Sequence, residues 1–458
     1  MNTYLTTTFV ADVLEKSGAS VHSFYRGNIN GGVADSRKVK GGELFAAFRG
    51  EHLDGNDFVE EALEAGAKAI ICEQVPEGNW PDQTIITVQD TRQALLELAR
   101  SWRKACDPFV IGITGTVGKT TTKELTAEVL QKRFKTHHSP GNFNSKEGLP
   151  LALLSLTSEM EVSVLEMGMD SPGEIATLCQ VAEPQCGVVL NIGTTHLEKL
   201  GTMEAITKEK LSLVKSLDIA ATAILNIDDP RIEPVIKELS CNVITFGSNK
   251  KAMLKHGPVK NLGLDGSRFS VNWLGQKADV RLHMPGIHLV HNALAAIGVQ
   301  IVLGAELEYA ARAISETDAS SRMKIRHGKN GIILLDDTYN ASPLSVAGAL
   351  GFLKDLQGRR IAFLGEMAEL GTQSDIEHRR IGTISAKSCD LLYLVGERCQ
   401  LIFEEAKQTG HKDVYWFNNK ESALQALLKE LTSGDIILLK GSRSEELESL
   451  IPTLEAKI

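Results

Sequence analysis

Short apolar runs alternate with stretches of helical periodicity along almost the whole chain. In the first part, GGELFAAF (41–48) predicts a strand, and FVEEALEAGAKAIICE (58–73) predicts a helix followed by a strand. Residues 90–107 carry apolar side chains at the spacing of one helix face, which predicts an amphipathic helix. The pair Asp107-Pro108 then interrupts the pattern, so we expect a domain boundary there.

From residue 108 to about 315 the pattern is that of an α/β domain. Several of its apolar runs are continuous rather than alternating, as expected for strands that helices cover on both faces of a sheet. A helix with an alanine-rich face is predicted over 289–304. The predicted strands are 108–114, 162–167, 186–192, 221–227 and 242–246.

A second α/β series begins near residue 316, with strands predicted at 331–337, 359–365, 390–396 and 435–441. We therefore expect an α/β protein of three domains, residues 1–107, 108–315 and 316–458. The predicted architecture is a central parallel-sheet domain, flanked by an N-terminal α/β domain and a C-terminal Rossmann-like domain.

Composition excludes several classes of function. The chain has 458 residues, a formal net charge of −9 and a pI of about 5.8, which disfavours general binding to nucleic acid or a membrane surface. Its seven cysteines are scattered and form no C-x-x-C pair, which favours a reducing compartment over a disulfide framework or a structural zinc. No run reaches the ~18 apolar residues of a membrane span, and the N-terminus has no apolar signal core. A cytoplasmic protein without membrane insertion is expected.

The stretch GITGTVGKTT (112–121) has the composition of a phosphate-binding loop. It departs from the general pattern G-x-x-x-x-G-K-[ST], because Ile113 stands where the first glycine belongs. A buried strand, a glycine-rich turn and a helix from about Lys119 to Arg133 still form the arrangement that phosphate binding needs. Lys119 would reach the terminal phosphates, and the Thr120 hydroxyl would bind Mg²⁺. The alternative is a tight turn with an exposed lysine.

Two further polar side chains follow neighbouring predicted strands. Glu166 ends the strand VSVLEM, and His196 follows CGVVLNI. Ligands collect at the carboxyl ends of parallel strands, so we expect Thr120, Glu166 and His196 at one edge of the sheet, around Mg²⁺. Imidazole is an unusual ligand for this ion. Taken singly, Glu166 would more simply be an N-cap partner and His196 a loop hydrogen-bonder.

TGTVGKTT (114–121), EMG (166–168), NIGTTHLEKLG (191–201) and MPGIHLVHNALAA (284–296) resemble the ATP-dependent Mur ligases of bacterial cell-wall synthesis. Within that family, further stretches resemble the member that adds D-alanyl-D-alanine. They are DSRKVKGGELFAAFRGEHLDG (35–55), SPGNFNSKEGLP (139–150), DDTYNASP (336–343), GEMAELG (365–371) and KGSR (440–443). The match runs in order over nearly the whole chain. It implies an amide ligase that joins D-alanyl-D-alanine to UDP-N-acetylmuramoyl-tripeptide through an acyl phosphate, as a monomer.

The resemblance also implies a role for each matching residue. Glu166 and His196 would serve two Mg²⁺ sites with Thr120, and Arg322 would reach the γ-phosphate of ATP. Asn292 would contact adenine, and Asp337 would hold the ribose. The implied ATP-binding residues are Gly115, Thr116, Gly118, Lys119, Thr120, Thr121, His288, Asn292, Arg322, Asp337 and Asn340. The implied catalytic residues are Lys119, His196, Lys210 and Arg322. Ser36, Arg37, Gly50, Asp54 and Gly55 would receive the uridine end, and Asn142 and Asn144 would face the peptide-bearing substrate.

The predicted helix GTMEAITKEKLSLVKSL (201–217) contains Lys208 and Lys210, which cannot share one face. By default both are solvated. The resemblance implies instead that Lys210 carries a carbamate made with CO₂, which turns a cation into a carboxylate-like metal ligand. Lys208 is the alternative carbamate site, because TKEK aligns ambiguously.

Four positions depart from the family pattern: Val117, Leu289 and Ser342, where asparagine is frequent, and Ser321, where glycine is usual. None removes a charged group. The base for the attacking amine is not identified; His378 and Glu369 are candidates, and a structural role on the surface is the alternative for both. A sister ligase adding one amino acid and a non-catalytic nucleotide-binding module remain alternatives. The sequence leaves open whether residue three of the accepted peptide is lysine or diaminopimelate.

Overall fold

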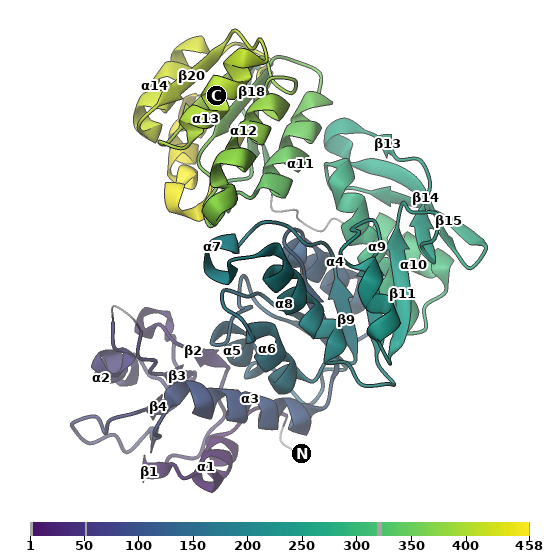
Figure 1. Cartoon of the computed structure of the whole chain (residues 1–458). Helices are drawn as coiled ribbons and strands as arrows, with labels where there is room; N and C mark the ends of the chain where they lie inside the picture. The colour runs from purple at the N-terminus through teal and green to yellow at the C-terminus, as the bar shows by residue number, and fades with distance from the viewer. Residues whose placement is uncertain (1–2, 51–52, 318–322, 458) are drawn as a thin grey trace.

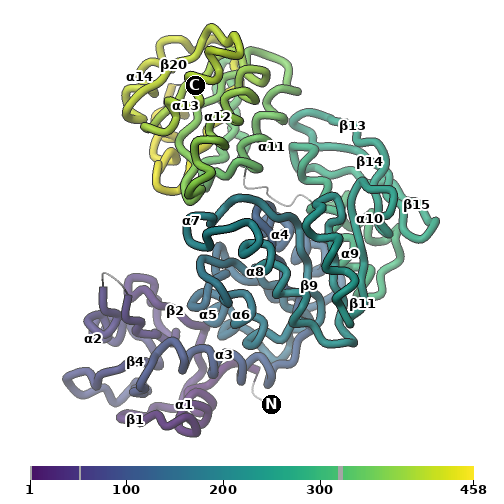
Figure 2. The backbone as a smooth tube through the Cα atoms, viewed as in Figure 1, coloured from purple at the N-terminus to yellow at the C-terminus, as the bar shows by residue number. Residues whose placement is uncertain are grey.

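The computed structural model describes residues 3–50, 53–317 and 323–457. Three β-sheets occupy successive parts of the chain, and each has its own helices (Figure 1). The N-terminal domain is purple, the central domain is teal, and the C-terminal domain runs from green to yellow. The tube in Figure 2 shows the same three bodies along a bent path. The three-domain α/β fold is thus confirmed, and its exact boundaries stay a prediction.

The N-terminal domain has a five-stranded sheet in the order β1-β5-β4-β3-β2. Only the pair β1–β5 is antiparallel. The predicted helix at 90–107 is α3, whose Trp102 donates a hydrogen bond from Nε1 to the Leu156 carbonyl, 3.1 Å away in the central domain. The strands are β1 Ser20–Ser23, β2 Gly32–Val33, β3 Leu44–Ala46, β4 Ala69–Cys72 and β5 Thr84–Thr87; the helices are α1 Thr7–Lys16, α2 Val59–Glu64 and α3 Thr91–Cys106.

The central sheet follows the order β13-β14-β12-β11-β10-β9-β6-β8-β7, with β15 paired to β14. The strands from β6 to β12 pair in parallel. The five predicted runs form β6, β8, β9, β10 and β11, while β7 and β12 are short strands that were not predicted. An antiparallel extension, β13 to β15, was not predicted, because its alternating residues lack a long apolar run. The strands are β6 Phe109–Thr114, β7 Thr136–His138, β8 Val162–Glu166, β9 Cys186–Val189, β10 Thr222–Asn226, β11 Asn242–Gly247, β12 Leu254–His256, β13 Lys260–Asn261, β14 Ser267–Trp273 and β15 Gln276–Leu282.

Helices cover both faces of this sheet, which explains its continuous apolar strands. In β6, Val110 faces the cluster that contains Leu213 of α8, whereas Ile111 faces the cluster that contains Val129 of α4. The helices are α4 Lys119–Gln131, α5 Gly148–Leu153, α6 Glu174–Ala182, α7 Leu197–Leu200, α8 Met203–Lys215, α9 Val290–Val302 and α10 Leu307–Ser315.

The C-terminal sheet has the order β16-β17-β21-β18-β19-β20, and only β16–β17 is antiparallel. Its four predicted strands are β17, β18, β19 and β21, while β16 and β20 are additional edge strands. The strands are β16 Lys324–His327, β17 Ile333–Asp336, β18 Arg360–Leu364, β19 Leu391–Val395, β20 Val414–Phe417 and β21 Ile436–Lys440; the helices are α11 Pro343–Lys354, α12 Ser374–Ser385, α13 Cys399–Gln408, α14 Lys420–Glu430 and α15 Ile451–Lys457. Within the described ranges, none of the helices is both long enough and apolar enough to cross a membrane.

Candidate active site

The loop between β6 and α4 has the backbone shape of an anion-binding turn. Gly118 is the N-cap of α4 with φ 86°, a conformation that L side chains rarely adopt. A Cβ atom there would lie 2.7 Å from Nδ2 of Asn292. Asn292, on α9, donates from that atom to the Gly118 carbonyl over 2.9 Å. The glycine therefore lets α9 pack against the loop, with the N-terminus of α4 directed at the cavity.

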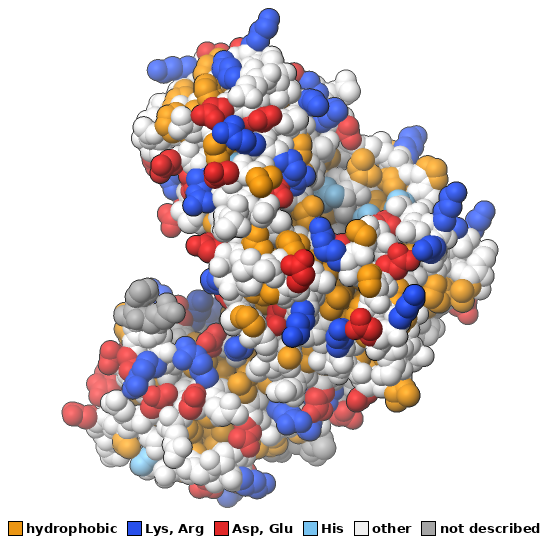
Figure 3. Space-filling view, in the orientation of Figure 1, with side chains coloured by type: hydrophobic (Ala, Val, Ile, Leu, Met, Phe, Trp, Pro, Cys, Tyr) orange, Lys and Arg blue, Asp and Glu red, His pale blue; other side chains and the backbone are white. Residues whose placement is uncertain are grey.

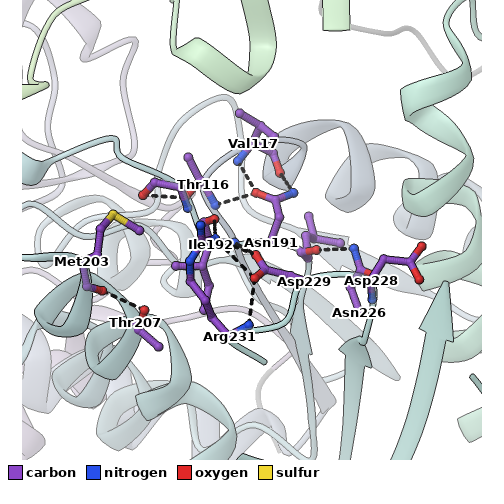
Figure 4. A network of polar contacts seen from close by, with 12 residues as sticks. Thr116, Val117, Asn191, Ile192, Met203, Thr207, Asn226, Asp228, Asp229 and Arg231 are labelled. Carbon is purple, nitrogen blue, oxygen red and sulfur yellow. Dashed lines mark hydrogen bonds and ion pairs between the residues drawn. The ribbon is translucent and has the colours of Figure 1, made fainter. Parts of the chain in front are cut away.

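The side chain of Asn191 fixes the other flank of the loop (Figure 4). Its Oδ1 accepts hydrogen bonds from the backbone N–H groups of Thr116 and Val117, at 3.1 and 2.9 Å. Its Nδ2 donates to the Val117 carbonyl over 3.0 Å. Residue 117 is thus held through its main chain. The sequence motif NIGTTH contained Asn191, but sequence reasoning assigned no role to it.

Thr120 and Glu166 lie at the sheet edge, as predicted. The Thr120 hydroxyl donates to Oε2 of Glu166 over 2.6 Å. The other carboxylate oxygen accepts from Nδ2 of Asn144 over 2.7 Å. Glu166 is fully buried, and its carboxylate joins the phosphate loop to the segment that carries Asn144.

Lys210 is buried, contrary to the default expectation of a solvated lysine. It is 1% exposed, whereas Lys208 is exposed on the same helix α8. Its Nζ donates to the Gly115 carbonyl over 3.1 Å. Burial, together with the nearby charge of Lys119, holds the pKa of Lys210 well below its usual value. Lys119 folds back on the loop, with Nζ 2.9 Å from the same carbonyl oxygen.

His196 contacts two carboxylates, and its role as a metal ligand stays a prediction. Its Nδ1 lies 2.7 Å from Oε2 of Glu369 and 3.3 Å from Oδ1 of Asp170. The Glu369 contact joins the central domain to the C-terminal domain. His196 beside Glu369 holds the pKa of that carboxyl below its usual value, against the effect of burial.

A cavity of about 420 Å³ opens between the central and C-terminal domains. One wall is the phosphate loop with the start of α9, and the other comes from the turn after β17 and the start of α11. In Figure 3, histidine side chains reach the surface near the junction of these two domains. The predicted ATP-binding residues on its walls are Thr116, Gly118, Lys119, Thr120, Thr121, His288, Asn292, Asp337 and Asn340.

Lys440 is the main feature of the C-terminal wall that sequence reasoning left without a role. It ends β21 inside the motif KGSR and is 2% exposed. Its Nζ donates to Oδ2 of Asp337 over 2.6 Å and to the Asn340 carbonyl over 2.9 Å. A lysine directly after an apolar strand was the available signal. On the same wall, Ser342 is the N-cap of α11 in a capping box with Ser345, a position that asparagine also suits.

A second cavity, of about 760 Å³, adjoins the first and shares Thr120, Thr121 and Tyr339 with it. Asn142 lines it from the central domain, and Arg326 and Arg443 line it from the C-terminal domain. The predicted peptide-facing residues Asn142 and Asn144 thus lie beside the Thr120–Glu166 pair.

The predicted uridine-site residues form local turns of the N-terminal domain. Ser36 is buried, and Arg37 is exposed and bonded to Asp35. Asp54 caps the turn that begins at Gly55 and accepts from Asn56. The Gly50 N–H donates to the Leu53 carbonyl over 2.8 Å.

The structure corrects the expectation for His378 and does not describe Arg322 and Ser321. His378 is fully buried rather than on the surface. Its Nδ1 lies 2.7 Å from the Ser374 carbonyl and its Nε2 accepts from the Met367 N–H, so it has no ring nitrogen left to accept a proton from a substrate amine. Arg322 and Ser321 lie outside the described residues.

Three family models match the chain in order. They are the Mur ligase family catalytic domain over residues 28–103, the Mur ligase middle domain over 113–300, and the Mur ligase glutamate ligase domain over 321–443. Among curated proteins, the UDP-N-acetylmuramoyl-tripeptide–D-alanyl-D-alanine ligase of Bacillus subtilis is 33% identical over 93% of each chain. The ligase of the same name from Escherichia coli is 31% identical, over 92% of this chain and 93% of that protein.

Solved structures agree with these matches. MurF from Acinetobacter baumannii superimposes with a TM-score of 0.88 at 27% identity, over 99% of both chains. MurF ligase from Thermotoga maritima, solved in complex with ADP, gives a TM-score of 0.81 at 29% identity, over 93% of this chain and 97% of that one. With relatives above 30% identity over nearly its full length, this chain belongs to the Mur ligase family.

Proposed function

We propose that the chain is an ATP-dependent amide ligase that joins D-alanyl-D-alanine to UDP-N-acetylmuramoyl-tripeptide, giving ADP and phosphate. The observation that carries this proposal is the cavity between two domains. The phosphate loop forms one wall, and the Asp337–Lys440 pair forms the other. The relatives named above supply the substrates.

The reaction has to activate a carboxylate, because oxide cannot leave. Phosphoryl transfer from ATP to the terminal carboxylate of the peptide forms an acyl phosphate, which the amine of D-alanyl-D-alanine attacks as phosphate leaves. Two anions approach in the first step, so positive charge close to the transferred group lowers the barrier. Lys119 would supply this charge, and its Nζ at the phosphate loop supports that role. Asp337 and Asn340 would hold the nucleoside.

The donors at the sheet edge suit Mg²⁺. The Thr120 hydroxyl and the Glu166 carboxylate are oxygen ligands at 2.6 Å from one another, and Mg²⁺ completes such sites with phosphate oxygens and water. The bound ion would neutralise phosphate charge. Glu166 would then exchange its hydrogen bond from Thr120 for the ion. A second ion would use His196 and Lys210 as ligands, the latter in its carbamate form.

Lys210 is suited to carry a carbamate. Only a neutral amine attacks CO₂, and burial beside Lys119 favours the neutral form of Lys210 by lowering its pKa. The amine nitrogen forms a bond to the carbon of CO₂, one C=O electron pair moves onto oxygen, and the nitrogen releases one proton to water, which leaves a carbamate anion. This anion would replace repulsion from Lys119 with attraction.

The carbamate can be tested with ¹³C-bicarbonate. A carbamate ¹³C resonance should appear in the wild-type protein and disappear in Lys210→Arg. Lys208→Arg, on the exposed side of the same helix, should keep the resonance. A signal that disappears only in Lys208→Arg would move the carbamate to the alternative site.

Arg322 keeps its predicted role at the γ-phosphate. We expect Arg322→Ala to lower turnover much more than it lowers the affinity for the uridine-linked substrate. Steady-state kinetics together with equilibrium binding of that substrate separates the two effects. Equal losses in turnover and in substrate affinity would show that Arg322 has no specific role in phosphoryl transfer.

A phosphate-release assay tests the ligase itself. We expect release that requires both UDP-N-acetylmuramoyl-tripeptide and D-alanyl-D-alanine, and no release with single amino acids, glutamate included. Lys119→Met should abolish phosphate release, whereas Lys132→Met, at the exposed end of the same helix, should not.

Release with a single amino acid would favour a sister ligase. ATP binding without product from any pair would favour a non-catalytic module. Paired assays with lysine- and diaminopimelate-containing peptides identify the third residue.

We further propose that the protein acts in the cytoplasm as a monomer. All seven cysteines are free, as in a reducing compartment, and both walls of the cavity come from one chain. Sedimentation of the active enzyme with its substrates would detect a dimer.

A further inference from the structure

Three potential metal ligands from separate elements meet beside the nucleotide cavity. Asp228 follows β10, His256 ends β12, and His291 lies in the first turn of α9. One ring nitrogen of each histidine and one carboxylate oxygen all lie within 4.8 Å of one another. No local sequence motif predicts this cluster, because 28 residues separate Asp228 from His256 and 35 separate His256 from His291.

Hydrogen bonds to neighbouring backbone groups orient two members of the cluster. The Asp228 carboxylate accepts from the N–H groups of Ser248 and Asn249, at 2.7 and 2.8 Å. His256 contacts the Gly257 carbonyl through Nδ1 at 2.7 Å. A carbonyl only accepts, so Nδ1 carries the proton and Nε2 keeps the lone pair that a metal needs. Metal-binding histidines are commonly oriented by such a bond.

An ion pair alone accounts for only two of the three residues. His291 Nε2 lies 2.8 Å from Oδ2 of Asp228, which is a sufficient helix-to-loop contact. It does not explain the third residue, since the His256 ring stands edge-on to His291 with centroids 5.7 Å apart. Two imidazoles and one carboxylate form a typical three-ligand set for zinc, with water as fourth ligand.

We propose that Asp228, His256 and His291 bind one transition-metal ion of the zinc class. Two imidazole ligands disfavour Mg²⁺, so this site is chemically distinct from the Thr120–Glu166 pair. Tetrahedral zinc holds its ligand atoms roughly 3.3 Å apart, so His256 has to move towards the other two residues by about an ångström. His291 Nε2 and Asp228 Oδ2, now 2.8 Å apart, would lose the proton between them and separate slightly. The ion would link α9 to β10 and β12, one residue from Asn292, which contacts the phosphate loop.

Zinc uptake by the full chain in excess Mg²⁺ tests the site. Equilibrium dialysis of the metal-free protein should show one bound Zn²⁺, with affinity at least about tenfold lower in His256→Ala and in His291→Ala. His283→Ala is the matched control, because His283 belongs to the same domain but bonds to the Ser315 carbonyl. Glu166→Gln should keep the zinc, since it alters only the proposed magnesium site.

Metal absorption and thermal stability provide two further tests of the zinc site. Co²⁺ in the wild-type protein should give the visible absorption of a four-coordinate nitrogen and oxygen site, and Zn²⁺ should raise the unfolding temperature in wild type but not in His256→Ala. If His256→Ala does not fold, His256→Gln replaces it. The proposal is overturned if wild type binds no zinc, if both histidine variants bind it unchanged, or if Glu166→Gln loses it.

Discussion

At the scale of single residues, the face of α8 that carries each lysine decides which of the two is buried in the site. Helical periodicity correctly separated Lys208 from Lys210, but it could not say which of the two faced the protein interior. Lys119 and Thr120 were predictable from a local motif. The contacts of Asn191 and Lys440 were not, because each depends on loops that are distant in sequence.

Burial of Lys210 should lower the free energy of unfolding of the protein. The pKa of Lys210 is lowered by folding, so the unfolded chain binds more protons than the folded chain at pH values between the folded pKa and 10.5. We expect Lys210→Met to stabilise the protein at neutral pH, on the order of 1–4 kcal/mol, while abolishing ligation. The advantage should shrink as the pH rises towards 10.5, where wild type no longer has to lose a proton on folding.

Chemical denaturation across this pH range, in buffer depleted of CO₂, measures the effect. Lys208→Met, which changes an exposed lysine of the same helix, provides the baseline. A Lys210→Met protein that is less stable at neutral pH and shows no pH trend would contradict this account.

At the scale of elements, α4 joins the first cavity to the segment that carries Asn142 and Asn144. Its first turn faces the cavity, and one turn later the fully buried Lys123 donates to the carbonyls of Ser139 and Gly141, at 2.6 and 2.9 Å. These carbonyls belong to the segment that carries Asn142 and Asn144. The strands of the central sheet were predictable from their apolar runs, but their order was not. A lysine buried in this helix was not predictable either, because the sequence alone does not show which face of the helix packs against the sheet.

Lys123→Met should therefore disturb the peptide side more than the nucleotide side. Loss of two charged hydrogen bonds should lower the free energy of unfolding by roughly 2–4 kcal/mol. The KM for the uridine-linked peptide should rise, and ADP affinity should change less than about threefold. Lys132→Met, at the C-cap of the same helix, is the control for the substrate measurements. It loses its own hydrogen bond to the Ala313 carbonyl, so Lys208→Met, at an exposed lysine, is the control for stability. Equal changes in peptide KM and ADP affinity would show that Lys123 supports the helix as a whole.

At the scale of the whole molecule, the first cavity depends on the approach of two domains. Three domains and most strands could be predicted from apolar runs, but their relative placement could not, because it follows from contacts such as Glu369 with His196. An acyl phosphate hydrolyses readily in water, so closure of this interface should protect it.

Nucleotide binding should thus order both walls together. We expect ADP to slow hydrogen exchange in residues 116–121 and in 337–345, and to leave α2 in the N-terminal domain unchanged. Lys440→Met should weaken ADP binding about tenfold and remove protection from 337–345 more than from 116–121. Protection confined to 116–121 in wild type would show that the C-terminal wall does not take part.

The three hydrogen bonds of the Asn191 amide also determine which positions of this loop tolerate substitution. Because the Asn191 amide contacts only the backbone of residue 117, these three hydrogen bonds place no demand on the side chain at that position, and any residue that leaves room in the cavity should keep them. The constraint instead falls on position 191, where aspartate would lose the bond donated to the Val117 carbonyl and leucine would lose all three. In a library of variants selected for growth, position 117 should accept many residues, while position 191 accepts almost none.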